Sequence, residues 1–233
     1  MAREFPELTF KGGTCLNKAY FGYYRLSEDL DFVLPLDASR TVRAKRLSNF
    51  KDAFTAAFRP LGLEPVPVRS RHNEDRQGTY FFTYGGLVDG NPQNVQVDVT
   101  LRALALPPVA RPIASVFMDP VLLAPVFPGI TVACMDLREA MAEKLRAAMT
   151  RPEPAIRDFY DLAYVRRHAP DFDFEAIRPL VRVKLEESKF AYTYRDKLEF
   201  LRSRIRPELA PVVRDADSFD LDAAFRFVAG FEA

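Results

Sequence analysis

The sequence predicts a mixed α/β core at residues 1–130, followed by a helical C-terminal half at residues 131–233. Three observations support this fold class. In the first hundred residues, short apolar runs with strand-like alternation are interleaved with helical patterns. Residues 103–128 are rich in proline, which favours an extended connection over a helix. From Asp136 onward, apolar residues recur at helical spacing almost to the end of the chain.

The elements of the first half follow from their patterns in turn. The stretch "LTFKGG" is typical of a short strand that runs into a glycine turn, and "TCLNKAYFG" after it is compatible with a helix. "DLDFVL" is strand-like, and "SRTVRAKRLSNFKDAFTAAFRPLG" has the apolar spacing of a helix that ends at Pro60 and Gly62. Three further strands are expected, at "EPVPV", which its prolines weaken, at "TYFFTY" and at "VQVDVTLR".

The composition is that of an ordinary globular protein, with 48% apolar and 28% charged residues. A formal net charge of +1 excludes a global basic field for nucleic acid, but not a local patch. Cys15 and Cys134 lack zinc-like spacing, which indicates reduced thiols in a cytoplasmic protein. We expect no membrane segment, because no apolar run approaches the ~20 residues that a membrane helix needs.

Three aspartates are the candidate metal ligands. Residues i and i+2 of a strand point to the same side, so Asp29 and Asp31 project together at the start of "DLDFVL". Asp98 lies on the polar face of "VQVDVTLR", whose other face is apolar. Neighbouring carboxylates are tolerated when they are solvated or when a divalent cation such as Mg²⁺ or Mn²⁺ lies between them. Three acids on adjacent strands suit the two-metal arrangement of phosphoryl and nucleotidyl transfer.

The glycine turn is the candidate phosphate site. Gly12 and Gly13 let the backbone approach a ligand closely, and a following helix N-terminus offers free N–H groups to phosphate. The Thr14 hydroxyl adds one hydrogen bond. Either motif alone is weak evidence, but their close succession favours a nucleoside triphosphate (NTP) whose phosphates are bridged by metal.

A lysine stands out in the helix "MDLREAMAEKLRAAM", which begins with Asp136 as its N-cap. Lys144 falls within the apolar stripe of this helix, so it either snorkels to solvent or meets an anion such as a nucleotide phosphate. In the next helix Asp158 and Asp161 share one face. These two acids have a structural role, as a helix cap or in a salt bridge to the preceding helix, or a functional role. In the functional role, one of them orients Lys144 or a substrate group.

Four of these stretches in order, "KGGTCLNKAY", "RLSEDLDF", "EKLRAAMTR" and "RDFYDL", resemble the AbiEii/AbiGii-type toxins. These toxins are nucleotidyltransferases of the DNA polymerase β-like fold, and the MenT toxins are relatives. The resemblance spans about residues 8–165. Only eleven residues precede the glycine turn, where family members often carry a helical stretch.

The resemblance implies a function and a set of site residues. It implies a metal-dependent nucleotidyltransferase, with a mixed sheet and flanking helices and a helical domain that completes the active site. It also implies a toxin of a type IV toxin–antitoxin system that takes part in phage defence, has a cognate antitoxin and transfers a nucleotide to an acceptor, most simply tRNA. The family pattern carries over to Gly12, Gly13, Thr14, Arg25, Ser27, Asp29, Asp31, Lys144, Asp158 and Asp161.

The acceptor is open at this point. "SRTVRAKRLSNFK" carries five cations and no acid, which suits either RNA phosphates or an ordinary solvated helix face; they are Arg40, Arg43, Lys45, Arg46 and Lys51. The alternatives are an enzyme that modifies a protein or small molecule, and a non-catalytic module that binds a nucleotide and a partner. The intact set of acids argues against the second alternative.

Overall fold

The computed structural model describes residues 5–36, 39–67, 71–73, 76–86, 90–187 and 191–232. The chain divides into two compact units. Unit 1 comprises Met1–Gly22 and Ser27–Met135, and unit 2 comprises Tyr23–Leu26 and Asp136–Ala233. The short segment Tyr23–Leu26 therefore belongs with the C-terminal helices, although it lies between two candidate motifs of unit 1.

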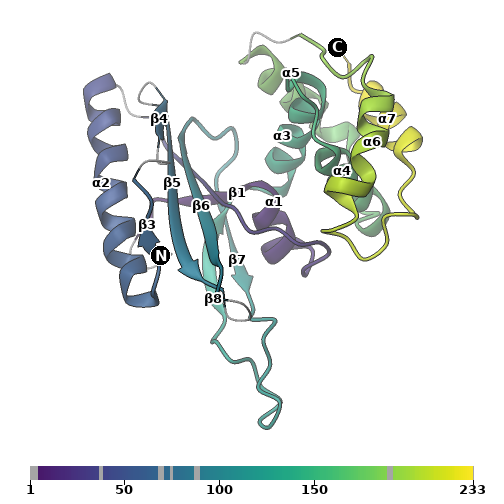
Figure 1. Ribbon diagram of the computed structural model, residues 1–233. Coiled ribbons are helices and arrows are strands. Elements are labelled where there is room, and N and C mark those ends of the chain that lie inside the picture. The colour runs from purple at the N-terminus through teal and green to yellow at the C-terminus, as the bar shows by residue number, and fades with distance from the viewer. Residues whose placement is uncertain are drawn as a thin grey trace. The chain divides into compact units, whose positions relative to one another are not determined.

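Unit 1 is built on a mixed sheet, as expected for this fold class (Figure 1). Its strands run in the order β3-β5-β6-β2-β1-β8-β7, and β4 pairs with β5. Two pairs, β2 with β6 and β1 with β8, are parallel, and the others are antiparallel. The bounds of the eight described strands are Thr9–Lys11 (β1), Leu30–Leu34 (β2), Glu64–Pro65 (β3), Arg71–Asn73 (β4), Gln77–Gly85 (β5), Pro92–Leu101 (β6), Val109–Ile113 (β7) and Ile130–Cys134 (β8).

Two helical segments accompany the strands of unit 1. The α-helix α1 (Gly12–Cys15) continues directly as a π-helix, η1 (Leu16–Tyr20). The long helix α2 (Arg40–Phe58) begins at Ser39, whose side chain accepts a hydrogen bond from the backbone N–H of Val42, and it ends in the 3₁₀ turn η2 (Arg59–Leu61). Figure 1 shows α2 alongside the strands of unit 1.

Alternation along the strands decides which face is apolar. Leu30, Phe32 and Leu34 of β2 pair with Val97, Val99 and Leu101 of β6, so all six point to the same side. They form a continuous core with apolar side chains of β5 and α2, namely Tyr80, Phe82, Leu47, Phe50, Phe54 and Phe58. The intervening residues of β2 and β6, including Asp31 and Asp98, project from the opposite face. We call these the apolar face and the acid face.

The structure corrects three details of the expected first half. The glycine pair does not form a turn ahead of the helix, because Gly12 is already the first residue of α1. Strand β3 is only two residues long, since Pro65 cannot donate to a ladder; Val68 lies outside the described residues. The proline-rich stretch 103–128 is not merely a connection, because it contains β7, whose pairing with β8 creates a long hairpin.

Unit 2 is helical, as expected. Its described helices are α3 (Leu137–Thr150), α4 (Ile156–His168), η3 (Glu175–Ile177, 3₁₀), α5 (Arg178–Glu186), α6 (Leu198–Arg204), η4 (Ile205–Leu209, π) and α7 (Leu221–Ala229). Asp136 caps α3, its carboxylate accepting from the backbone N–H of Arg138. The change from strand to helix follows β8, so this strand belongs with the sheet rather than with the half expected to begin at residue 131.

Candidate functional site

Two of the three candidate metal ligands are neighbours on the acid face. The parallel register of β2 and β6 places Asp31 directly opposite Asp98. Asp31 is half-buried and Asp98 is buried, whereas Asp29 is exposed just before β2 begins. Directly opposite residues of paired strands lie within reach of one another. The pair therefore concentrates two carboxylates at one position of the sheet, with a third two residues earlier.

Neutral donors hold the Asp98 carboxylate. Its Oδ1 accepts from Thr79 Oγ1 at 2.5 Å and from Gln77 Nε2 at 3.3 Å. Its Oδ2 accepts from Gln96 Nε2 at 2.6 Å. None of these donors carries a charge, so they orient the carboxylate without neutralising it. The three donors thus fix the orientation of the Asp98 carboxylate beside Asp31.

Gly12 brings the backbone against the Asp31 carboxylate. Its φ is +76°, a conformation that strains any residue with a Cβ. A Cβ at this position would also overlap the Asp31 carboxylate, lying only 2.9 Å from Cγ. Two independent constraints therefore demand glycine here, and both come from the fit of the α1 N-terminus to the acidic strand.

Thr14 and Ser27 are brought together as well. Thr14 Oγ1 lies 2.7 Å from Ser27 Oγ, which links α1 to the segment leading into β2. Thr14 is fully buried and Ser27 is half-buried. The second glycine, Gly13, continues α1 between Gly12 and Thr14. Four of the predicted nucleotide-binding residues thus gather next to Asp31, at the start of α1 and ahead of β2.

The carboxylates of Asp31 and Asp98 fit a hard divalent cation that takes its remaining ligands from water and substrate. Among the described residues, no group of three or more His, Cys, Asp or Glu is gathered closely enough to hold a metal. Mg²⁺ usually takes one or two carboxylates and fills its octahedron with water and substrate phosphate. The paired Asp31 and Asp98 supply such a partial set of oxygen ligands.

The remaining candidates form a buried ionic network within unit 2. Arg25 binds Asp161 with two bonds, from Nε to Oδ1 at 2.6 Å and from Nη2 to Oδ2 at 2.9 Å. Tyr24 donates to the same Oδ1 at 2.6 Å, and its ring stacks on Tyr164 at 4.2 Å. Bidentate, charge-assisted bonds of this kind are strong and geometrically specific. They fix the segment Tyr23–Leu26 onto α4.

Lys144 completes the network. Its Nζ lies 2.7 Å from Asp158 Oδ1 and 2.7 Å from Asp161 Oδ2, and its side chain is 12% exposed. The position inside the apolar stripe of α3 is therefore explained by two anions and not by snorkelling. The other Asp158 oxygen, Oδ2, is buried and accepts no hydrogen bond from a described residue, although Arg151 Nη1 lies 3.2 Å away.

The four charges balance one another, and the pKa values reflect this. Burial alone raises the pKa of Asp161, but Lys144 and Arg25 outweigh burial and hold that pKa at about 2. Burial lowers the pKa of Lys144, but Asp158 and Asp161 outweigh it and raise that pKa. Asp161 is therefore ionised near neutral pH, and the two cations beside it, Lys144 and Arg25, stay protonated.

Sequence reasoning missed two contributors to unit 2. Tyr24 carries no local signal of its bond to Asp161, which lies 137 residues away. Lys184 of α5 is fully buried and pairs with Glu139 at 2.5 Å and with Glu143 at 3.2 Å, both on α3. A signal for Lys184 did exist, because it lies one turn from Val181 on the apolar stripe of α5, much as Lys144 does on α3.

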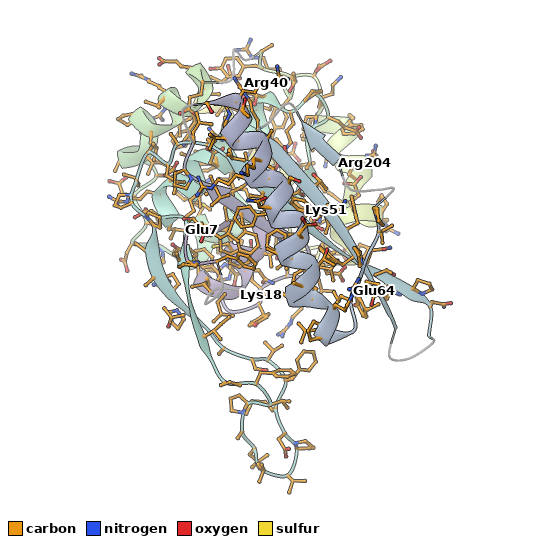
Figure 2. The ribbon with its side chains drawn as sticks, turned by 90° about the vertical axis from the view of Figure 1, so that its left-hand side faces the viewer. Glu7, Lys18, Arg40, Lys51, Glu64 and Arg204 are labelled. Carbon is orange, nitrogen blue, oxygen red and sulfur yellow. The ribbon has the colours of Figure 1, made fainter. Side chains whose placement is uncertain are left out.

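The basic helix lies away from the acids. The apolar side chains of α2 pack on the apolar face of the sheet, so α2 and the acid face are on opposite sides of the sheet. Figure 2 views the structure from the side of α2, with Arg40 at its N-terminal end and Lys51 further along. The cations of α2 therefore do not line the surface that carries Asp31 and Asp98.

Comparison with known proteins shows one family and two similar structures. The family model described as "Nucleotidyl transferase AbiEii toxin, Type IV TA system" matches residues 1–228. The crystal structure of JHP933 from Helicobacter pylori is similar, with a TM-score of 0.53 and 18% identity over 97% of this chain and 82% of that one. A putative nucleotidyltransferase from H. pylori has a TM-score of 0.51 and 19% identity over 97% and 84%. No curated protein matches the chain.

Proposed function

The chain belongs to the AbiEii nucleotidyl transferase toxin family of type IV toxin–antitoxin systems, and on that premise we propose that it transfers a nucleoside monophosphate from an NTP to an acceptor hydroxyl. In this reaction the acceptor oxygen attacks the α-phosphate, a new phosphodiester bond forms, and pyrophosphate leaves. The observation that carries the proposal is the pairing of Asp31 with Asp98 beside the Gly12 backbone.

Asp31 and Asp98, with Asp29 exposed just before β2, would hold Mg²⁺ or Mn²⁺ together with water and nucleotide phosphate. When bound, the metal supplies charge stabilisation for the phosphates and the departing pyrophosphate. Asp98 also positions the acceptor hydroxyl or takes its proton. The neutral donors Thr79, Gln77 and Gln96 support this role because they orient Asp98 without cancelling its charge.

The start of α1 is proposed to hold the phosphate tail. Gly12 and Gly13 lie at the N-terminus of α1, where backbone N–H groups lack partners within the helix, and the absence of a Cβ at Gly12 allows close approach beside Asp31. Thr14 and Ser27, which bond to each other, tie the start of α1 to the segment that carries Asp29. We assign Gly12 and Gly13 to phosphate contact, and Thr14 and Ser27 to positioning and to hydrogen bonding with the nucleotide.

The unit 2 network is proposed to contribute through Lys144 and Asp158. Lys144 is the candidate phosphate ligand, and Asp158, whose Oδ2 accepts no hydrogen bond from a described residue, is the candidate catalytic carboxylate of this unit. Arg25 and Asp161 are more deeply buried and bind each other, which supports a positioning role for the Tyr23–Leu26 segment. Because Ser27 and Asp29 follow this segment directly, its anchoring restrains the motif next to it along the chain.

We propose RNA, and within it a tRNA 3′ end, as the acceptor, and a cytoplasmic location. Membership of a toxin–antitoxin family implies a cognate antitoxin. None of the helices in the described ranges is long and apolar enough to cross a membrane. Because α2 and the acid face lie on opposite sides of the sheet, the cations of α2 would touch only an acceptor large enough to extend around the sheet. An acceptor that does not reach α2, such as a protein or a small molecule, is therefore the second candidate.

The test is product analysis with α-labelled NTPs. The purified protein is incubated with Mg²⁺ and total RNA, protein extract or small hydroxyl acceptors, and label transfer is followed with and without EDTA. Asp31→Asn should abolish transfer, whereas Asp171→Asn, an exposed acid of unit 2, should leave it intact. Label in no acceptor, or full transfer by Asp31→Asn, would overturn the proposal. Label in protein or small molecules alone would exclude RNA.

A further inference from the structure

The strands β7 and β8 are joined by a hairpin, residues 114–129, whose apolar side chains face solvent. Among them, Phe117, Val121, Leu122, Leu123 and Phe127 are 60–85% exposed. Figure 1 shows this segment extending beyond the ends of β7 and β8. A group of exposed apolar side chains gathered on one segment in this way marks an interaction site.

Hydrogen bonds give this apolar hairpin a defined shape. The backbone N–H of Val126 donates to Phe117 O at 2.8 Å, and that of Asp119 donates to Ala124 O at 2.8 Å. The Asp119 carboxylate accepts from the backbone N–H groups of Val121 and Leu122 at 2.8 and 2.7 Å. The tip therefore holds its leucines outward before any partner arrives, which lowers the entropy cost of binding.

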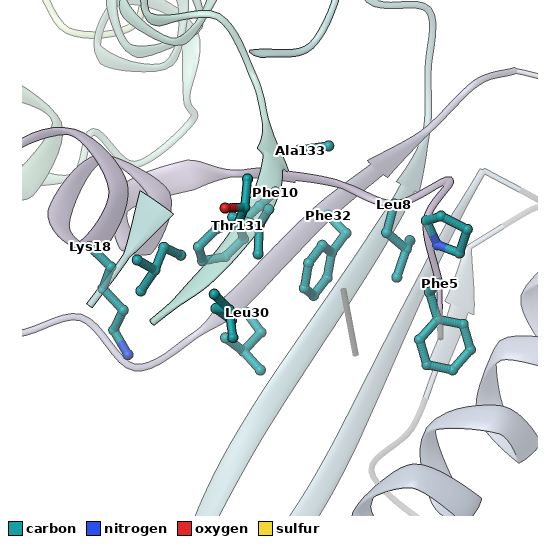
Figure 3. A pocket seen from close by; sticks show the side chains of 12 residues that line it. Phe5, Leu8, Phe10, Lys18, Leu30, Phe32, Thr131 and Ala133 are labelled. Atoms are coloured by element: carbon teal, nitrogen blue, oxygen red, sulfur yellow. The ribbon is translucent and has the colours of Figure 1, made fainter. Parts of the chain in front are cut away.

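The same unit contains an apolar pocket of about 300 Å³ (Figure 3). It opens on the apolar face of the sheet and is lined by Leu8, Phe10, Leu30 and Phe32. Its wall also includes Ile113 and Ile130, the last residue of β7 and the first of β8, so the pocket adjoins the base of the hairpin. Among the lining residues Lys18 alone is charged.

The charges of the two features are complementary. Asp119 is the single charged residue between Arg111 and Asp136, and it lies at the hairpin tip. Lys18 lies at the pocket and has no ion-pair partner among the described residues. The lack of any Lys or Arg between Arg111 and Arg138 disfavours an anionic lipid surface, which attracts basic segments. A protein partner with its own apolar pocket and a nearby cation fits better.

We propose that the apolar hairpin of one copy of this chain seats in the apolar pocket of a second copy, with Leu122 and Leu123 inside the pocket and Asp119 near Lys18. The apolar side chains at the hairpin tip and the charge of Asp119 complement the apolar lining of the pocket and its Lys18. Both complementary parts belong to unit 1, so every copy offers both. The inference concerns self-association and does not depend on the proposed function.

The first test is sedimentation velocity of the full chain across a range of protein concentrations. Wild type should self-associate reversibly, and Leu122→Lys should weaken association by about 100-fold or more, because it places a second cation in an apolar pocket that already holds Lys18. Leu61→Lys is the matched control, since Leu61 is 71% exposed but lies outside hairpin and pocket. A wild type that stays monomeric, or equal effects of the two variants, would overturn the proposal.

The second test identifies the contact directly. Lys18→Cys and Leu122→Cys proteins are mixed under mild oxidation, and a disulfide-linked pair should form only in the mixture. Lys18→Cys mixed with Leu61→Cys should give none. Lys18→Glu should weaken association several-fold by facing Asp119, and adding Asp119→Asn, which keeps the turn acceptor, should recover part of the loss. Cross-linking that does not distinguish Leu122→Cys from Leu61→Cys contradicts the assigned contact.

Discussion

Replacing Asp161 with asparagine should destabilise the helical unit strongly while preserving its shape. The variant retains an oxygen acceptor but removes one of the two anions that balance Arg25 and Lys144. One buried cation is then left without compensation. Removing one partner of a buried ion pair typically costs about 3–5 kcal/mol. In a chain of this size, that loss lowers the Tm by about 6–20 °C.

The pKa of Asp161 gives an independent estimate and predicts the pH dependence. The pKa falls from 3.8 to about 2 on folding, which corresponds to about 2.5 kcal/mol of stability. Because the folded pKa is the lower one, this contribution is complete above pH 3.8 and is lost as the pH falls toward 2. The stability difference between wild type and Asp161→Asn should therefore be constant at neutral pH and shrink between pH 4 and 2.

Urea unfolding followed by circular dichroism measures this difference at a series of pH values. Asp171→Asn, an exposed acid of the same unit, serves as the control and should change the free energy of unfolding by less than about 0.5 kcal/mol. If Asp161→Asn costs no more than the control, or if the difference does not decline in acid, the network does not stabilise the unit as argued.

The remaining predictions concern backbone strain, a second buried pair and thiol reactivity. Gly12 and Gly62 have the same φ of +76°, but only Gly62 has open space where a Cβ would lie. Gly62→Ala should therefore lower the free energy of unfolding by ~1–2 kcal/mol, the cost of the backbone conformation alone. Gly12→Ala should cost more in urea unfolding, and the difference measures the overlap with Asp31. Lys184→Met should lower the free energy of unfolding by about 3–5 kcal/mol, because it leaves Glu139 charged and buried; a loss of under 1 kcal/mol would contradict this. The contact with the neighbouring thiol and burial raise the pKa of Cys15, so native protein at pH 8 should resist alkylation there by iodoacetamide, as mass spectrometry would show.

Local pattern determined much of the fold and the membership of the candidate site. The period-two alternation of "VQVDVTLR" separated Asp98 from the apolar face, and the helical spacing of α3 singled out Lys144 as a residue that either snorkels or meets an anion. The i, i+3 spacing placed Asp158 and Asp161 on the face that Lys144 meets. Such inferences succeed because side-chain direction follows from the backbone geometry of a few neighbouring residues.

Only the tertiary structure decided which distant residues meet. Parallel pairing of β1 with β8 joins segments more than a hundred residues apart, and no local signal predicts it. The register that sets Asp31 opposite Asp98, the bond from Arg25 to Asp161 and the burial of Lys184 against Glu139 arise in the same way. Each of these contacts depends on how whole helices and strands pack their apolar faces against one another. That packing determines which polar groups are buried, and buried polar groups must be paired.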